Sequence, residues 1–294
     1  MTGTSLGELA SSLSARLGDG VLARWVVEEA ADLSPGRLVL LARRQAPGEV
    51  LERCEEMAAR LEAGEPLQHV LGHWSFRTLE LAVDGRALVP RPETEVVTGL
   101  ALDELDRLRR LRHGGRPGRH GGLLALDLGT GSGAIACSLA SEAGDVRVVA
   151  TDRSLAALSL AADNVAALPS EVRARIELAA GDWYSAVPPG LAGQVDVVVS
   201  NPPYLAEDEW ARLDPVVAEH DPYEALVAGP SGLEAIEAVV AGAPALLAPG
   251  GSLVVELAPH QAAAALALAR RAGAVEAAVE HDLAGRQRVL VARW

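Results

Sequence analysis

The chain has 294 residues and a net charge of −14, with 40 acidic and 26 basic side chains, and its basic residues are all arginines. The lack of lysine excludes mechanisms that need a lysine Schiff base, a P-loop lysine or a lysine general base. The acidic balance argues against a protein whose affinity comes mainly from neutralising nucleic-acid phosphates. Cys54 and Cys137 are too few for a disulfide framework or a cysteine zinc site. At about 150 residues per domain, the length favours two domains.

The sequence has the features of a cytoplasmic protein that does not contact a membrane. Glu8 precedes the first basic residue, Arg16, so the start of the chain lacks the charged and apolar regions of a signal peptide. The longest apolar tract, residues 239–258, is interrupted by Pro244 and Pro249. We therefore expect no membrane span.

Residues 5–63 have the apolar spacing of helices. Ser5 and Glu8 form a capping-box pattern. Between Pro47 and Gly64, the spacing of the residues places the apolar side chains on one side of a helix and the charged side chains on the other. We expect a small N-terminal helical domain over residues 1–73.

After Trp74 the apolar residues repeat with a period of two. A run from Phe76 to Val83 leads into Asp84-Gly85, a common hairpin turn, and a second apolar run follows at 87–89. This pattern predicts a β-hairpin over residues 74–90 that links two domains.

Residues 106–122 contain six arginines, five glycines and one aspartate, a composition that predicts a solvated loop. From residue 123 onward, strand-like runs alternate with helical segments, which predicts a mostly parallel sheet with helices on both faces. We expect strands at 123–128, 146–152, 175–182, 194–200 and 251–258, and helices at 133–143, 154–167, 231–247 and 260–272. The last two runs, 274–281 and 286–294, are expected to pair antiparallel.

A glycine-rich segment follows the first of these strands and opens a helix. Its residues are Gly129, Thr130, Gly131, Ser132 and Gly133. Glycine allows positive φ and close approach of a ligand to the backbone, and open α/β sheets bind ligands at this edge. The G-x-G-x-G spacing differs from the dinucleotide pattern G-x-G-x-x-G. Together with the acidic Asp127 before it, the spacing favours S-adenosylmethionine as the cofactor.

Two further strand ends carry candidate cofactor contacts. Asp152 ends the second strand, where a carboxylate can accept hydrogen bonds from both ribose hydroxyls; alternatively, it caps the helix that begins near Ser154. After the third strand, Asp182 offers a carboxylate to an adenine amino group and Trp183 offers a flat apolar face. Trp183 could instead plug the edge of the sheet.

The most specific motif is Asn201-Pro202-Pro203-Tyr204, directly after the fourth strand. The two prolines remove two N–H donors and fix φ, so the carbonyl groups of Asn201 and Pro202 can act as acceptors. With the Asn201 side-chain oxygen, they could hold both N–H bonds of a substrate NH2 group beside the cofactor, and Tyr204 would pack on the planar substrate. We therefore predict Asn201 and Pro202 as the catalytic groups. All four residues of the motif, Pro203 and Tyr204 included, are predicted to contact the substrate, and Asn201 is also predicted to contact the cofactor. The segment could also be only a rigid turn, but its place beside the glycine loop favours a substrate site.

These motifs resemble those of class I S-adenosylmethionine-dependent methyltransferases that act on amino nitrogens. A wider set of segments is similar to the HemK/PrmC family of release factor glutamine methyltransferases: GEPLQHVLGHWSF (64–76), LVPRPETE (88–95), LDLGTGSGAIA (126–136), SNPPY (200–204), EAL…GLEAI (224–236), ELAPHQ (256–261) and DLAGRQRVL (282–290). His69, Ala258 and residues 220–222 depart from the family pattern, but they lie outside the glycine loop and the Asn-Pro-Pro-Tyr segment.

The resemblance implies an α/β fold and a specific reaction. It implies a class I (Rossmann-like) methyltransferase domain over residues 91–294, with a mostly parallel seven-stranded sheet and an antiparallel last strand. It also implies that the helical domain helps to dock a peptide chain release factor. The reaction would be methylation of the side-chain amide nitrogen (N5) of the glutamine in its Gly-Gly-Gln tripeptide.

Other functions remain open at this point. Asn-Pro-Pro-Tyr also occurs in N6-adenine and guanine-N2 nucleic-acid methyltransferases, and a non-catalytic S-adenosylmethionine-binding protein is a second alternative; a nicotinamide dehydrogenase ranks lower because of the glycine spacing. Residues 207–224 carry seven carboxylates and one arginine, which would repel a phosphate backbone and complement a basic protein. We expect release factors as partners and no direct nucleic-acid binding. His69 and His73 have helical zinc spacing, but Gly72 intervenes, and we expect no metal.

Overall fold

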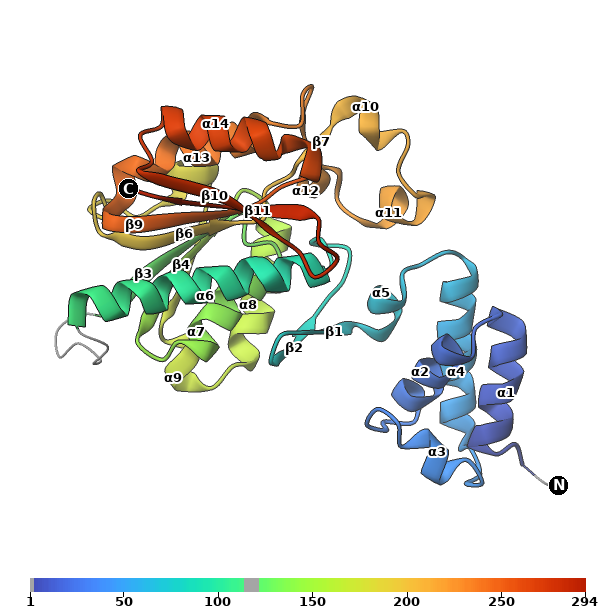
Figure 1. Cartoon of the computed structure of the whole chain (residues 1–294). Coiled ribbons are helices and arrows are strands. Elements are labelled where there is room, and N and C mark those ends of the chain that lie inside the picture. Colours follow the sequence, from blue (N-terminus) through green and yellow to red (C-terminus); the bar gives the residue numbers. More distant parts are fainter. Residues whose placement is uncertain (1–2, 114–121) are drawn as a thin grey trace. The chain divides into compact units, whose positions relative to one another are not determined.

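The computed structural model describes residues 3–113 and 122–294, and it divides the chain into two compact units, Met1–His73 and Trp74–Trp294 (Figure 1). Each unit has its own apolar core. Within the two described ranges, no helix is both long enough and apolar enough to cross a bilayer.

The first unit is a bundle of helices: α1 (Leu6–Leu17), α2 (Gly20–Ala30), α3 (Leu38–Leu41), α4 (Gly48–Glu62) and α5 (Leu67–Leu71). The predicted capping box forms at the start of α1, where the Ser5 hydroxyl accepts the Glu8 N–H and the Glu8 carboxylate accepts the Ser5 N–H at 2.8 Å. The apolar faces of α1, α2 and α4 meet in a core that includes Leu13, Val26 and Cys54.

The predicted hairpin forms with a different turn. Strand β1 (His73–Phe76) pairs with β2 (Leu79–Ala82), and the turn lies at Arg77 and Thr78, where Arg77 has a φ of 53°. The prediction of a strand that runs to Val83 and turns at Asp84-Gly85 is therefore wrong. Asp84 forms a local turn instead, because its carboxylate accepts the backbone N–H of Arg86 at 2.9 Å.

The predicted loop over residues 106–122 is also wrong in its described part. Helix α6 (Pro92–His113) continues through residues 106–113, whereas residues 114–121 lie outside the described residues. Leu105 and Leu108 are buried on its inner face. The arginines of this stretch form ion pairs: Arg107 with Glu104, Arg109 with Asp145 and Arg112 with Asp196. Pairing of these three arginines, within α6 and with other elements, replaces the solvation that the composition predicted.

A seven-stranded sheet forms the centre of the second unit. Its strands are β3 (Leu123–Leu128), β4 (Val146–Asp152), β5 (Ile176–Ala180), β6 (Val195–Ser200), β9 (Leu247–Glu256), β10 (Glu276–His281) and β11 (Gln287–Arg293), in the order β10-β11-β9-β6-β3-β4-β5. β11 is antiparallel to both of its neighbours, and the other pairs in the sheet are parallel. The predicted fold class is confirmed. The chain order reverses between β3 and β6, a switch point where open sheets form a ligand crevice.

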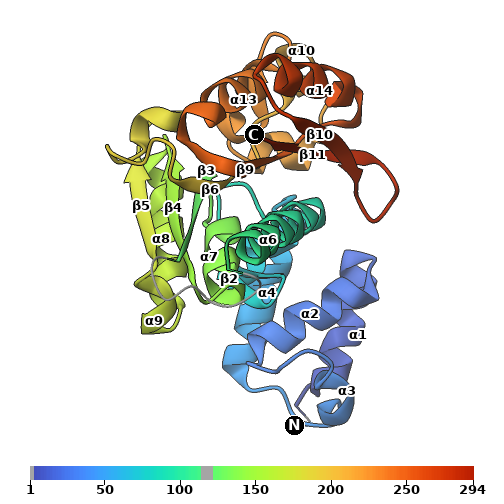
Figure 2. The same ribbon diagram turned by 60° about the vertical axis from the view of Figure 1, so that its left-hand side comes forward.

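Helices cover both faces of this sheet (Figures 1 and 2). On one face lie α6, α7 (Ala134–Glu142), α8 (Leu155–Ala167) and α9 (Ser170–Arg173), and on the other lie α13 (Glu234–Leu246) and α14 (Ala262–Arg271). Successive strand residues point to opposite faces, so Val197 and Val199 pack in the core under α6 and α7 whereas Val198 packs under α13. This unit is thus a three-layer α/β sandwich.

Short elements fill the chain between β6 and α13. They are β7 (Leu205–Ala206), α10 (Glu207–Trp210), α11 (Pro215–His220), α12 (Tyr223–Leu226) and β8 (Val227–Gly229), with β7 parallel to β8. The acidic segment 207–224 lies here, and part of its charge is neutralised internally. Asp208 pairs with Arg212, and the buried Asp221 pairs with Arg91 at 2.6 Å.

Candidate active site

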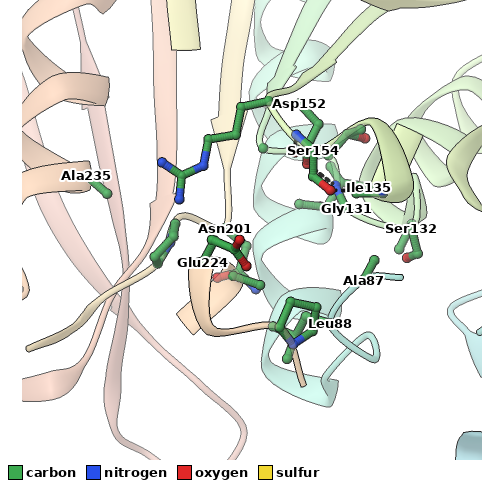
Figure 3. A pocket seen from close by; sticks show the side chains of 18 of the residues that line it. Ala87, Leu88, Gly131, Ser132, Ile135, Asp152, Ser154, Asn201, Glu224 and Ala235 are labelled. Atoms are coloured by element: carbon green, nitrogen blue, oxygen red, sulfur yellow. Dashed lines mark hydrogen bonds between the residues drawn. The ribbon is translucent and has the colours of Figure 1, made fainter. Parts of the chain in front are cut away.

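A cavity of about 240 Å³ lies at the carboxyl ends of β3, β4 and β6, beside the switch point (Figure 3). Many of the residues predicted from the sequence line it: Gly129, Thr130, Gly131, Ser132, Asp152, Asp182, Trp183, Asn201 and Pro203. The fold therefore brings the glycine loop, two strand ends and the Asn-Pro-Pro-Tyr segment to one place. Gly133, Pro202 and Tyr204 are outside the lining.

The glycine loop leaves β3 through three left-handed residues. The φ angle is 70° at Gly129, 57° at Gly131 and 82° at Gly133, in a region that residues with a side chain rarely adopt. The N–H groups of Gly129 and Thr130 both donate to the carbonyl of Thr151, at 2.8 and 2.9 Å, which fastens the loop to β4. Gly133 precedes α7 and packs against α8, where an added Cβ would lie 3.2 Å from a side chain. Gly133 thus shapes the loop from outside the cavity.

Asp152 connects the glycine loop to the start of α8. Its Oδ2 accepts the N–H of Gly131 at 2.9 Å, and its Oδ1 accepts the N–H of Ser154 at 2.8 Å (Figure 3). The N-cap of α8 is Ser154, whose hydroxyl accepts the N–H of Ala157. Each carboxylate oxygen has two acceptor sites, so Asp152 can still accept hydrogen bonds from a ligand in the cavity. Asp152 therefore does not cap α8, as the alternative supposed; it orders the turn before the helix and lines the cavity.

Trp183 and Asp182 close another side of the cavity. Trp183 begins the 3-10 helix η1 (Trp183–Ala186) with a φ of 44°, and a Cβ added at Gly129 would lie 3.7 Å from its ring. The ring also packs on the apolar cluster between the sheet and α13, as the sheet-plug alternative supposed. Asp182 is exposed and lines the cavity next to it. Together they offer a flat apolar face and a carboxylate to an aromatic amine.

Asn201 lies at the end of β6 with its side chain in the cavity lining (Figure 3). The end of the strand is fixed by Ser200, whose buried hydroxyl donates to the carbonyl of Leu128 at 2.7 Å. Nδ2 of Asn201 donates to Oγ1 of Thr94 at 3.0 Å. The carbonyl Oδ1 is therefore the acceptor end of this amide.

The rest of the Asn-Pro-Pro-Tyr segment is held by the protein. Pro203 lines the cavity, whereas Pro202 is buried. Tyr204 packs in the apolar cluster on the α13 side of the sheet, and burial raises its pKa to about 12. The carbonyl of Tyr204 accepts a hydrogen bond from Nε2 of Gln261 at 2.8 Å, in the 3-10 helix η2 (Pro259–Gln261).

The sequence reasoning did not place several lining residues in the site. They are Arg86, Ala87, Leu88, Val89, Pro90, Arg91, Thr94, Ala134, Ile135, Arg153, Ser154, Ala157, Gly181, Pro222, Glu224, Ala225, Val227, Ala228, Glu234 and Ala235. Most belong to residues 86–94 and 222–235. Segments 88–95 and 224–236 support the family resemblance, so the signal was present, but local periodicity did not indicate that they meet at the glycine loop.

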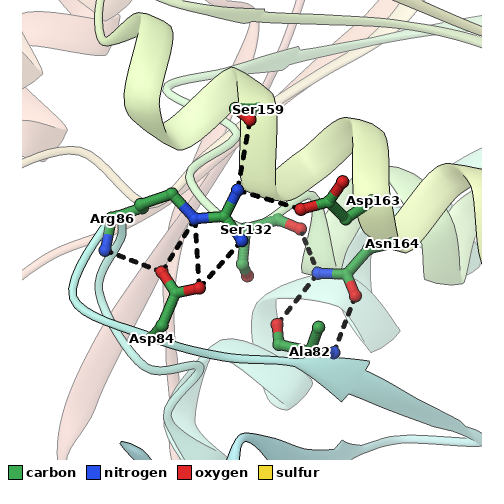
Figure 4. A network of polar contacts seen from close by, with 7 residues as sticks. All are labelled: Ala82, Asp84, Arg86, Ser132, Ser159, Asp163 and Asn164. Atoms are coloured by element: carbon green, nitrogen blue, oxygen red, sulfur yellow. Dashed lines mark hydrogen bonds and ion pairs between the residues drawn. The ribbon is translucent and has the colours of Figure 1, made fainter.

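A polar network holds the glycine loop from behind (Figure 4). Asn164 on α8 donates to the carbonyl of Ser132 at 2.8 Å, and its amide also bonds both backbone groups of Ala82 on β2. Arg86 forms an ion pair with Asp84 at 2.8 Å in the same network. The loop, α8 and the segment after β2 are therefore tied together at the edge of the cavity.

Two buried carboxylates lie behind the lining. Asp127 accepts the Thr130 hydroxyl at 2.6 Å, but burial outweighs this bond and raises the pKa of Asp127 to about 7. Glu256 accepts the Thr94 hydroxyl at 2.7 Å, and burial likewise raises the pKa of Glu256 to about 7. Both groups thus titrate near neutral pH, which is common at functional sites.

The histidines with zinc spacing have other surroundings. His69 is buried in α5, and Nε2 of His73 lies 2.8 Å from Oε2 of Glu29 within the first unit. Across residues 3–113 and 122–294, no group of three or more His, Cys, Asp or Glu side chains is arranged to hold a metal ion.

Comparison with known proteins decides the family. Residues 6–72 match the model of the PrmC N-terminal domain, and residues 119–217 match that of the methyltransferase small domain. The chain is 39% identical to the release factor glutamine methyltransferase of Cereibacter sphaeroides, over 92% of this chain and 90% of the relative. It is 38% identical to that of Deinococcus radiodurans, with the same coverage. The chain belongs to the release factor glutamine methyltransferase family.

The fold comparison agrees with this membership. The catalytic domain of hMettl16 superposes with a TM-score of 0.52 and 16% identity, covering 73% of this chain and 74% of that one. At this identity the likeness concerns the fold alone, a Rossmann-like methyltransferase sheet. Family members of this kind are S-adenosylmethionine-dependent methyltransferases, and so is this chain.

The cavity residues fit S-adenosylmethionine. An atom added at Gly131 would meet its nearest neighbour only at 4.0 Å, so the backbone there is open to a ligand. Asp152 can accept hydrogen bonds from hydroxyl groups, Trp183 offers an apolar face, and the lining carries more apolar than charged groups. These residues would hold the cofactor.

Proposed function

We propose that the chain transfers a methyl group from S-adenosylmethionine to the side-chain amide nitrogen (N5) of the glutamine in the Gly-Gly-Gln motif of peptide chain release factors. The family membership supports this reaction. The observation that carries it is the place of Asn201: an amide with its carbonyl as the acceptor end lies in the same cavity as the glycine loop and Asp152. A primary amide substrate needs such an acceptor.

The residues act by holding the substrate still. When bound, S-adenosylmethionine supplies an electrophilic methyl group on a positively charged sulfur. We assign Oδ1 of Asn201, which lines the cavity, to one N–H bond of the glutamine amide. We assign the carbonyl of Pro202, a buried residue next to the lining, to the other. Because an amide nitrogen is a weak nucleophile, acceptors for its N–H bonds favour the charge that develops there, and alignment can supply about 7–11 kcal/mol. No lysine is required for this role.

We assign the parts of the chain to separate tasks. Residues 1–73 would dock the release factor, residues 74–90 would link the domains, and residues 91–294 would carry out methyl transfer. The exposed carboxylates of segment 207–224 complement a basic protein surface better than a phosphate backbone. We therefore propose a cytoplasmic protein substrate and no direct nucleic-acid binding. Added salt is then expected to raise the KM for the release factor more than that for S-adenosylmethionine.

A labelling experiment tests the reaction. The full chain is incubated with methyl-labelled S-adenosylmethionine and an unmethylated release factor, with duplex DNA and ribosomal RNA in parallel tubes, and mass spectrometry locates the methyl group. We expect label on the glutamine of Gly-Gly-Gln, and none on a release factor in which that glutamine is glutamate. Label only on nucleic acid, or on neither, contradicts the proposal.

A further inference from the structure

The Glu256 carboxylate is buried beside the site without a direct role in it. It ends β9 and is 1% exposed, and its described hydrogen-bond donor is the Thr94 hydroxyl, 2.7 Å from Oε2. Burying an ionisable group without full pairing lowers the stability of the fold. A position that keeps such a group next to the cavity therefore calls for a functional reason.

Thr94 connects Glu256 to Asn201. The Thr94 side chain is itself buried, at 4% exposure, and lies near the start of α6. Its hydroxyl donates to Glu256, and its oxygen accepts Nδ2 of Asn201 at 3.0 Å. Glu256, Thr94 and Asn201 thus form a hydrogen-bonded relay, which runs from β9 through α6 to the end of β6.

The ionised carboxylate of Glu256 fixes the direction of the hydrogen bonds in this relay. A carboxylate can only accept, so the single hydroxyl hydrogen of Thr94 is committed to Glu256. The Thr94 oxygen can then bond only a donor, and the donor end of the Asn201 amide is Nδ2. The carbonyl Oδ1 is left at the opposite end. If the amide were rotated by half a turn, it would present NH2 to a substrate NH2, and two donors cannot form a hydrogen bond.

We propose that Thr94 and Glu256 are positioning residues that fix which end of the Asn201 amide faces the substrate. This inference rests on the proposed function, because it takes the substrate group to be a primary amide. Neither residue needs to touch the reacting nitrogen. Their effect reaches it through Asn201.

Protonation of Glu256 is expected to loosen this control. A protonated Glu256 can donate to Thr94, and the Thr94 hydroxyl is then free to donate to Oδ1 of a rotated Asn201 amide. The charged groups that face Glu256 are Arg91, just before α6, Glu93, at the start of α6, and Arg288 on β11. Tyr204 lies nearby. Burial prevails over the Thr94 bond and the two arginines, and it raises the pKa of Glu256 to about 7. Turnover should therefore fall as the pH falls through this value.

The test uses substitutions of Thr94 that separate the effect of its hydroxyl group from the effect of its side-chain shape. Thr94→Val keeps the branched shape but removes the hydroxyl, and we expect kcat to fall about 10- to 100-fold, the usual effect of losing a bond to a charged partner. Thr94→Ser keeps the hydroxyl and should recover most of that loss. Thr98→Val is the matched control, because Thr98 is equally buried one turn along α6 and its hydroxyl bonds only the Thr94 carbonyl among the described contacts. The affinity for S-adenosylmethionine should be unchanged in all three.

The pH profile and a direct titration complete the test. In Glu256→Gln, we expect a lower kcat at alkaline pH and loss of the step near pH 7 that the wild-type chain shows; Asp127, which also titrates there, is unchanged in this variant. Carboxyl NMR should give Glu256 a pKa near 7 in the absence of turnover. Wild-type kcat in Thr94→Val, or an unaltered pH step in Glu256→Gln, overturns the inference. If Asn201→Ala also keeps its turnover, Asn201 leaves the mechanism and the relay loses its target; if only Asn201→Ala is impaired, the proposed function stands without the relay. The proposed function itself fails only if the wild-type chain forms no N5-methylglutamine.

Discussion

Helix α6 contacts strand β9 at two levels, and a buried carboxylate lies at each. In the middle of the strand, the Ser252 hydroxyl donates to Glu104, as do the guanidinium groups of Arg107 and Arg293, the latter at 2.6 Å. Burial opposes ionisation of Glu104, but the bonds from Arg293, Ser252 and Arg107 together outweigh it and hold its pKa at about 2. This carboxylate is charged, paired and structural.

At the end of the same strand the balance is reversed. Glu256 accepts a hydroxyl rather than a guanidinium, and burial raises its pKa to about 7. The same helix and strand therefore hold two carboxylates with different roles. The fully paired Glu104 stabilises the sandwich, whereas the incompletely paired Glu256 sets the direction of a hydrogen bond in the cavity.

The largest effect should come from the cavity end. Asn201→Ala removes the acceptor for the substrate amide and should lower kcat by about 10²–10³, or about 2.7–4 kcal/mol, by analogy with the loss of one preorganised polar partner. Single-turnover methyl transfer at saturating S-adenosylmethionine measures it. Near-normal turnover would remove Asn201 from the mechanism.

Substitution of Glu104, the paired carboxylate away from the cavity, should change the stability of the fold rather than the turnover. Glu104→Gln removes the carboxylate that pairs with Arg107 and leaves Arg293 paired only with the exposed Glu276. We expect a loss of about 2–3 kcal/mol in the free energy of unfolding, less than for a fully buried pair because both arginines are partly exposed. Urea unfolding followed by circular dichroism gives the value. Glu276→Gln, at the exposed side of Arg293, is the matched control and should cost less than about 1 kcal/mol. Equal losses in the two variants would contradict the structural role of Glu104.

The cofactor side of the cavity gives an intermediate effect. Asp152→Ala removes a carboxylate that orders Gly131 and can accept from hydroxyl groups, so S-adenosylmethionine should bind about 10- to 100-fold more weakly. Calorimetric titration measures the affinity. Asp163→Ala, an exposed carboxylate on α8 that pairs with Arg86, should bind as the wild-type chain does. Unchanged affinity in Asp152→Ala would leave Asp152 only its part in the turn.

The smallest effect is a gain in stability. Because the pKa of Glu256 rises from near 4.5 in the unfolded chain to about 7 in the folded one, the folded state binds the proton more tightly, and stability falls as the pH rises between these values. Glu256→Gln should therefore be more stable than the wild-type chain at pH 8, with no gain near pH 4. We expect about 1–2 kcal/mol, less than the roughly 3 kcal/mol to which the full pKa shift corresponds, because the NH2 group of the glutamine is itself a buried polar group. Urea unfolding at the two pH values checks this, and a loss at pH 8 would indicate that Glu256 stabilises the fold.

The sequence predicts best where the signal is local. The seven strands of the central sheet and helices α7, α8, α13 and α14 follow apolar periodicity, whereas α9 and the short elements between β6 and α13 were not predicted. The glycine loop and Asn201 follow motifs whose chemistry depends on neighbouring residues. The sequence predicts the hairpin turn at the wrong place because the Asp84 side chain bonds Arg86 instead of closing a hairpin. It predicts solvated arginines in residues 106–113 because partners such as Asp196 are distant in the sequence.

The same limit applies to the relay. Thr94 and Glu256 lie 162 positions apart, and the sequence around neither residue indicates that their side chains form a hydrogen bond. Sequence reasoning could find Asn201 from the motif around it. It could not find the residues that orient Asn201, because the topology of the sheet brings them together.

The single-turnover rate of N5-methylglutamine formation in a release factor, measured for Glu256→Gln beside Glu104→Gln, tests the account most directly. The rates are measured with both variants folded and saturated with S-adenosylmethionine. We expect Glu104→Gln to react at the wild-type rate and Glu256→Gln to react at about one tenth of that rate or below. Equal rates in the two variants, or no N5-methylglutamine from the wild-type chain, would contradict it.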